Sequence, residues 1–228
     1  QAISPFGIGA ILDFQDDSLV LASPDIWIFS TTSNPDVKID EYELYEERLA
    51  DFLGVEKFYT PPDYRIPPVN AKEEDKINTL LRLPFIRFPL SYVCSACKKI
   101  HRALGHQKTA PECYCSSKMV NKTHPARFVA ACKKGHIQDF PWDYWVFKGS
   151  PPHDLDKYDF FMRGGSSSGL NGIIIECKDK SGKLIKKRTM AGAFSKLDKT
   201  CDGLNPVKNI PNADQPVGES CTEVLEAR

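Results

Sequence analysis

Long hydrophobic runs are absent from this sequence, and so is the pattern of a secretory signal. No apolar run approaches the roughly 20 residues that a membrane-spanning helix needs, so we expect no membrane contact. The opening stretch "QAISPFGIGAILDF" has neither a basic n-region nor an apolar h-region, which favours a cytoplasmic protein. The first residue is Gln rather than Met, so we expect the natural N-terminus to lie further upstream.

The sequence also lacks a net charge. It contains 30 Lys and Arg residues and 30 Asp and Glu residues, whereas a strongly basic nucleic-acid-binding protein shows an imbalance. A balanced chain can still carry a local basic face. DNA or RNA binding is therefore neither supported nor excluded by the charge.

Motifs of nucleotide-driven motors and of common hydrolases are missing as well. The Gly-x-Gly in "PFGIGA" has no third glycine and no following helix pattern, and "RGGSSSG" (residues 163–169) has no Gly-Lys-Ser/Thr after it. We interpret the first as a turn and the second as a surface loop. No paired-carboxylate or Ser–His–Asp arrangement stands out, so we expect no catalysis by this chain.

The sequence does contain enough apolar residues for a packed core, with 41% hydrophobic and 26% charged residues. The pattern of elements predicts an α+β fold of small mixed segments, rich in loops, with zinc-ribbon-like β-hairpins. We expect three segments. These are an N-terminal α/β segment (1–90), a zinc-ribbon-like segment (91–150), and a hairpin and loop-rich segment (151–228) that leads into a further C-terminal domain.

Four stretches carry clear secondary-structure patterns. The stretch "GAILDFQDDSLVLAS" predicts a hairpin, "PFIRFPLSYVC" a strand that leads to Cys94, and residues 173–190 a hairpin with an Asp-Lys-Ser-Gly turn. Residues 40–54 predict a helix that Asp40 caps and Gly54 ends. Its apolar face, which we expect to pack in the core, consists of Tyr42, Tyr45, Leu49, Phe52 and Leu53.

Cysteine is abundant. Without a secretory signal, and with Cys-x2-Cys spacing, metal ligation is favoured over disulfides. The candidate metal ligands are one histidine, His136, and eight cysteines: Cys94, Cys97, Cys113, Cys115, Cys132, Cys177, Cys201 and Cys221.

Four of these cysteines form a zinc-ribbon-like pattern, Cys-x2-Cys-x15-Cys-x-Cys. Cys94 and Cys97 form a first knuckle, and zinc takes four such ligands in a tetrahedron. The second knuckle is contracted relative to Cys-x2-Cys. One of its cysteines is then spare in one interpretation, with Cys132 or His136 in its place, and His101 and His106 are further candidates.

A second pair, Cys132 and His136, has the four-residue spacing of two ligands on one face of a helix or turn. Cys177, Cys201, Cys221 or His153 could complete it. In the alternative interpretation His136 is a hydrogen-bonding residue beside a helix start. A zinc-dependent hydrolase or nuclease that uses His136 and Asp139 is the enzymatic alternative.

Aromatic and basic side chains surround these patterns. Phe140, Trp142, Tyr144, Trp145 and Phe147 are better explained by core packing than by base stacking. Basic residues near the knuckles either contact phosphates or are solvated surface residues. They are Lys98, Lys99, Arg102, Lys108, Lys118 and Lys122.

Three stretches in order, "ISPFGIGAILDF", "EERLADFLGVEKFYTPP" and "RFVAACKKGHIQDFPWDYW", resemble the DrmB family. This family is the zinc-ribbon-type component of the DISARM anti-phage defence system of bacteria. The resemblance spans most of the chain, and its most specific part is Cys-x2-Gly-His-x-x-Asp-Phe-Pro-Trp, which starts at Cys132. Family members are longer, so we expect this chain to be an N-terminal part.

The resemblance implies a non-motor subunit that joins a superfamily-two helicase (DrmA-like) and helps it engage DNA, without catalysis of its own. A pure protein-interaction scaffold is the remaining alternative. One departure concerns the second zinc site. Family members tend to carry Cys-x2-Cys after the predicted strand at 173–177, and here Cys177 is followed by Lys180 instead.

Overall fold

A computed structural model describes residues 7–14, 17–24, 27, 42–63, 65, 83–104, 109–165, 169–195, 197–207 and 218–228. The predicted helix cap Asp40 and the candidates His106 and Lys108 lie outside these ranges. The predicted α+β, loop-rich fold is confirmed, with small sheets and few helices. No helix in the described ranges has the length and apolar character to cross a membrane.

The chain divides into two compact units, one of residues 1–10 and 20–85 and the other of residues 11–19 and 86–228. The division into three segments stays a prediction. Strands β1 (Ile11–Asp13), β2 (Ser18–Leu21) and β5 (Phe85–Arg87) form one sheet in that order.

The first unit contains a small arm that differs from the predicted helix. Strand β3 (Glu43–Leu44) pairs antiparallel with β4 (Phe58–Tyr59), and helix α2 covers only Glu47–Leu53 between them. The helix ends at Gly54, whose φ of 65° suits glycine. The prediction of a helix over 40–54 is therefore wrong at its start, because Glu43 lies in strand β3 and pairs with Tyr59 of β4.

The expected packing of the α2 face is also wrong. No residue of the helix is buried, and Phe52 is 84% exposed and Leu53 55% exposed. Tyr45, just before the helix, is 82% exposed, and only Tyr42 is buried. A 3.6-residue pattern shows which side of a helix is apolar, but it does not show that another element covers that side.

The second unit begins with a network of hydrogen bonds that positions the strand ending at Cys94. The Arg87 guanidinium donates to both carboxylate oxygens of Asp17 at 3.0 Å, and the Tyr92 hydroxyl donates to the same carboxylate at 2.7 Å. Burial opposes ionisation of Asp17, but the Arg87 and Tyr92 donors hold its pKa below the usual range. The network ties the residue before β2 to β5 and to β6 (Ser91–Cys94).

Three further sheets build the second unit. Each is antiparallel and three-stranded, in the orders β7-β6-β8, β10-β9-β14 and β11-β12-β13. The strand bounds are β6 Ser91–Cys94, β7 Ile100–Arg102, β8 Thr123–Pro125, β9 Val129–Ala131, β10 Ile137–Asp139, β11 Tyr158–Gly164, β12 Ile173–Asp179, β13 Leu184–Thr189 and β14 Glu226–Ala227. The short helices are α3 Trp142–Phe147, η3 Leu155–Lys157 and η4 Leu170–Gly172.

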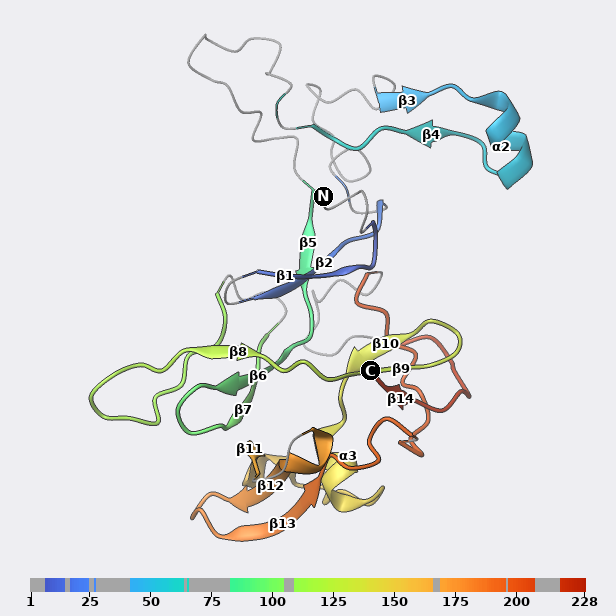
Figure 1. The fold of residues 1–228 in the computed structure, drawn as a ribbon. Coiled ribbons are helices and arrows are strands. Elements are labelled where there is room, and N and C mark those ends of the chain that lie inside the picture. Colours follow the sequence, from blue (N-terminus) through green and yellow to red (C-terminus); the bar gives the residue numbers. More distant parts are fainter. Residues whose placement is uncertain are drawn as a thin grey trace. The chain divides into compact units, whose positions relative to one another are not determined.

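The hairpin predicted for residues 173–190 is confirmed as β12 and β13, and the strand leading to Cys94 is confirmed as β5 and β6. The predicted loop at 163–169 is partly wrong, because Arg163 and Gly164 complete β11. Figure 1 shows α3 beside the sheet of β11, β12 and β13.

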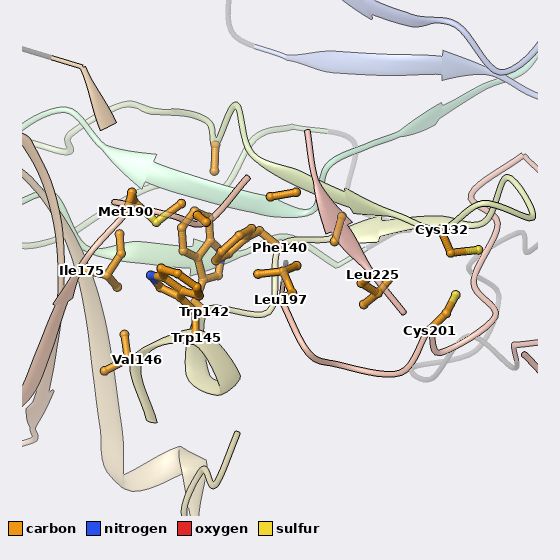
Figure 2. Close-up of a cluster of buried hydrophobic side chains, with 14 of the residues drawn as sticks. Cys132, Phe140, Trp142, Trp145, Val146, Ile175, Met190, Leu197, Cys201 and Leu225 are labelled. Carbon is orange, nitrogen blue, oxygen red and sulfur yellow. The ribbon is translucent and has the colours of Figure 1, made fainter. Parts of the chain in front are cut away.

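The core of the second unit lies between α3 and these sheets. Phe140, Trp142 and Trp145 are at most 7% exposed and pack with Ile175, Met190 and Leu225, as Figure 2 shows. The Phe140 and Trp142 ring centroids are 4.6 Å apart. The predicted core role of the five aromatics after His136 is confirmed for these three and for Phe147, whereas the Tyr144 hydroxyl donates to the Asp198 carbonyl.

We expect two matched substitutions to separate the core from the arm. Phe140→Ala should lower the free energy of unfolding by about 3–5 kcal/mol, because a 1%-exposed ring leaves a cavity. Phe52→Ala should change it by less than about 0.5 kcal/mol, because its ring is already in solvent. Urea unfolding followed by circular dichroism measures both. If Phe52→Ala lowered the free energy of unfolding as much as Phe140→Ala, the observed exposure of α2 would be contradicted.

Candidate metal centres

Cys94, Cys97, Cys113 and Cys115 come together in the structure, and we call them the first ligand group. Their sulfur atoms all lie within 4.8 Å of one another. The Cys94 and Cys115 Sγ atoms are 3.9 Å apart, and those of Cys97 and Cys113 are 3.7 Å apart. A disulfide would bring two sulfurs to about 2.05 Å, so these cysteines are all free thiols.

The first knuckle forms where β6 turns into β7. The Cys94 N–H donates to the Lys99 carbonyl at 2.9 Å, and the Lys98 N–H donates to the Cys94 carbonyl at 3.1 Å. Lys98 takes a left-handed φ of 67° to close this turn. The Ala96 N–H then points at the Cys94 sulfur, 3.4 Å away. A tight turn with an N–H directed at a sulfur stabilises a thiolate.

The second knuckle is held by Asn121, which lies just before β8. The backbones of Cys113 and Asn121 exchange two hydrogen bonds of 3.0 and 2.9 Å. The Asn121 side-chain amide also donates to the Cys115 sulfur at 3.3 Å. The two knuckles are joined because the Ser95 N–H donates to the Lys122 carbonyl at 3.0 Å. The contracted Cys-x-Cys spacing thus still brings both sulfurs to the first knuckle.

The geometry of the first ligand group fits one tetrahedral ion. With metal–sulfur bonds of about 2.3 Å, neighbouring sulfurs of a tetrahedron lie about 3.8 Å apart, which is the mean of the two distances above. Burial raises the pKa of Cys94, but the N–H groups of Cys97 and Ala96 lower it more, to about 7. Burial and the neighbouring thiols raise the pKa of Cys113 to about 12. A central cation is what allows all four thiols to ionise together.

Cys132, His136, Cys201 and Cys221 form the second ligand group, again with all ligand atoms within 4.8 Å of one another. The Cys132 Sγ lies 3.4 Å from His136 Nδ1, close to the roughly 3.6 Å expected for sulfur and nitrogen ligands of one tetrahedral ion. In Figure 2 Cys132 and Cys201 lie together at one end of the core, beyond Leu225. Three of the four residues are buried, and Cys221 is half-buried.

Three separate stretches supply the second ligand group. Cys132 and His136 flank the β9–β10 turn, in which the Cys132 N–H donates to the His136 carbonyl at 3.0 Å and Gly135 takes a φ of 85°. The Cys201 N–H donates to the Glu223 carbonyl at 2.8 Å, which brings the stretch around Cys221 alongside. The Gly203 N–H donates to the Cys201 sulfur at 3.3 Å.

A carboxylate lies behind the histidine. With Nδ1 facing the sulfur of Cys132, the other ring nitrogen, Nε2, lies 3.6 Å from the Glu219 carboxylate. Metal-bound histidines commonly direct their second nitrogen at a carboxylate, which fixes the ring and its tautomer. Sequence reasoning missed Glu219, because nothing in its local sequence relates it to His136.

The structure also places the other candidates. Cys177 belongs to neither group; it is fully buried in β12, and burial raises its pKa to about 11. The structure therefore places Cys177 as a core residue and not as a metal ligand. His101 in β7 and the exposed His153 are likewise outside both groups. Asp139 accepts hydrogen bonds from the Leu90 and Ser91 N–H groups at 3.2 and 2.8 Å.

The candidate basic residues differ in their surroundings. Lys98, Arg102, Lys118 and Lys122 are exposed. The Lys99 ammonium instead lies 3.1 Å from the Asp159 carboxylate, which offsets part of its charge. Four described cations thus face solvent around the first ligand group.

Comparison with known proteins gives two findings. Residues 1–228 match the family model described as a domain of unknown function, DUF8724. The chain is 27% identical over 216 residues to the DISARM protein DrmB of Bacillus paralicheniformis, which covers 90% of this chain and 33% of that protein. The chain thus spans about a third of the length of this curated relative. The resemblance to DrmB inferred from the sequence motifs is confirmed, and by its full-length match the chain belongs to the DUF8724 family.

Proposed function

We propose that the chain is the zinc-binding N-terminal part of a non-motor subunit in a cytoplasmic, DISARM-type anti-phage defence complex. The similarity to a DISARM protein DrmB over 90% of the chain carries the proposal. In the proposal, the subunit binds a superfamily-two helicase of the DrmA type and assists its engagement of DNA. The helicase supplies the motor, and this chain supplies none.

Zinc is the metal that best suits both ligand groups. Four thiolates, or three thiolates and one imidazole, are typical of closed structural zinc sites. Catalytic zinc usually has three protein ligands and an open position, and both groups here provide four ligands. Bound zinc would fix the stretches that carry the two ligand groups.

The hydrolase alternative has less support. It requires His136 and Asp139 to act on a metal-bound water. His136 sits among four ligands of the second group, and the Asp139 carboxylate accepts two backbone N–H groups of the β5–β6 connection and the start of β6. These contacts favour structural roles for both residues, so the proposal assigns no catalysis to them.

Charge reversal in the full-length protein, assembled with its helicase, tests the DNA part of the proposal. We expect the double variant Lys118→Glu/Lys122→Glu to weaken DNA binding by the complex and to flatten its salt dependence. Each lost phosphate contact should reduce the slope of log K against log salt by about 0.9 on duplex DNA. Fluorescence anisotropy over a salt series measures this.

Lys157→Glu, an exposed lysine of η3, is the matched control and should leave the slope unchanged. Co-elution with the helicase during size-exclusion chromatography tests the partner separately. Unchanged DNA affinity with an intact complex would favour a pure protein scaffold. Failure to co-elute would refute the helicase partnership.

A further inference from the structure

The sheet of β11, β12 and β13 has one face that is covered by the core and one face that is partly open to solvent in the described part of the chain. Ile175 and Cys177 of β12 are fully buried in the core, and Phe160 and Met162 of β11 pack against it. On the same side Arg188 of β13 lies 3.4 Å from the Trp145 ring centroid in α3. Because side chains alternate along a strand, the residues between these point to the opposite face.

A cross-strand row runs over that opposite face. Lys99, just before β7, pairs with Phe161 of β11; Phe161 pairs with Glu176 of β12; and Glu176 pairs with Lys187 of β13. Phe161 is half-buried but does not belong to the core cluster. Row members lie beside one another on one face of the sheet, so the row is an aromatic ring and a carboxylate between two lysines.

Cations gather around the Phe161 ring. The Arg163 guanidinium carbon is 5.6 Å and the Lys178 ammonium 5.1 Å from its centroid. Glu176 forms ion pairs with Arg163 at 3.2 Å and with Lys178 at 3.1 Å. Each of these cations therefore already makes two contacts that hold it near the ring.

Cations outnumber carboxylates on this face. Asp159 is shared by Lys99 at 3.1 Å and Lys180 at 2.7 Å, just as Glu176 is shared by two cations. Lys187 is exposed and forms no ion pair within the described part of the chain. The whole chain has a net charge of zero, so this positive excess is local and complements an anionic partner.

We infer that the open face of the β11–β12–β13 sheet, which we call the Phe161 face, binds a single strand of nucleic acid. One base stacks on Phe161, and the Arg163 and Lys178 side chains move off the ring and away from Glu176 to hold the flanking phosphates together with Lys187. Proteins that bind single strands combine aromatic stacking with a cationic surface in this way. The inference rests on the proposed DNA engagement and gives it a surface distinct from Lys118 and Lys122.

The Phe161 face adjoins the first ligand group. The Met162 N–H in β11 donates to the Lys98 carbonyl at 2.8 Å, directly after the Cys97 ligand. A strand on Phe161 would therefore pass beside the exposed Lys98. The metal would act indirectly, by fixing the turn that carries Lys98 and Lys99.

The experiment uses the metal-loaded full chain and a fluorescein-labelled oligo-dT strand, with anisotropy measured over a salt series. Phe161→Ala should weaken binding at least about five-fold, because stacking contributes about 1–3 kcal/mol per base. Phe161→Trp should retain it. Lys187→Glu should reduce the slope of log K against log salt by about 0.7. Arg48→Glu, on the exposed face of α2, is the matched control.

Glu176→Gln separates nucleic-acid binding from a role in stability alone. Removing this carboxylate should tighten binding of the strand, since the phosphates then meet one anion fewer. If the face serves only to stabilise the sheet, Glu176→Gln loses two ion pairs and leaves binding unchanged. Thermal unfolding of each variant confirms that the fold persists.

Three results would overturn the inference: unchanged affinity for both Phe161→Ala and Lys187→Glu, equal binding of duplex DNA of the same length, or binding to phosphatidylserine vesicles but not to oligo-dT. Helicase co-elution and zinc content are measured on the same variants. If co-elution and zinc content persist while the affinity for oligo-dT does not depend on Phe161, the inference fails and the proposed function stands. If co-elution is lost for the unmodified chain, the proposed function fails instead.

Discussion

Cys94→Ser should lower the metal content of the protein and disorder the segment that carries the first ligand group. We expect metal content to fall by one ion per chain, because the four sulfurs of this group converge on one tetrahedral position. Structural zinc binding contributes about 10–16 kcal/mol in small zinc domains. Loss of this ion should therefore leave most of the segment around β6, β7 and β8 unfolded. Elemental analysis and hydrogen exchange measure both effects.

Cys177→Ala is the matched control for this experiment. Cys177 is buried like Cys94 but lies in the core and in neither ligand group. We expect it to lower stability modestly through a small cavity and to leave the metal content unchanged. Loss of both ions in Cys94→Ser, or loss of one in Cys177→Ala, would contradict the assignment of ligands.

Cys201→Ser has the second large expected effect, because it removes a ligand that joins distant stretches. We expect the second ion to be lost while the first remains. Strand β14 is short and pairs with β9 at Glu226 and Ala227, and the stretch just before it is hydrogen-bonded to the stretch that carries Cys201. The amides of β14 should therefore lose protection from hydrogen exchange, with those of β12 and β13 unaffected.

His136→Ala should reproduce this result, because His136 supplies the fourth ligand of the same group. His153→Ala is the control, since His153 is exposed and outside both groups. A second ion that survives both Cys201→Ser and His136→Ala would show that the second ligand group does not bind metal. His136 would then be a residue that only braces the β9–β10 turn.

Local patterns in the sequence predicted local structure well. The knuckle at Cys94 and Cys97, the hairpin at 173–190 and the aromatic core after His136 each depend on residues that are close in sequence. Turn chemistry and strand alternation contain that information. Which residues make up the second ligand group depends on contacts between distant stretches. The sequence therefore left Cys177, Cys201 and Cys221 as equal candidates.

The structure separates these cysteines by their environment. Cys177 lies two residues after Ile175 in β12 and points with it into the core. Cys201 lies in a stretch that the Thr200–Val224 bridge holds beside Cys221. Pairings between distant stretches cannot be read from periodicity. The same limitation of sequence patterns explains the error at α2. Leu49, Phe52 and Leu53 do lie on one apolar face of the helix, but no other described element buries that face.

The two ligand groups also differ in when a growing chain can complete them. The first group needs only the stretch from Cys94 to Cys115, so it can capture its ion early in synthesis. The second group needs Cys221 as well as Cys132, so it closes only after Cys221 has left the ribosome.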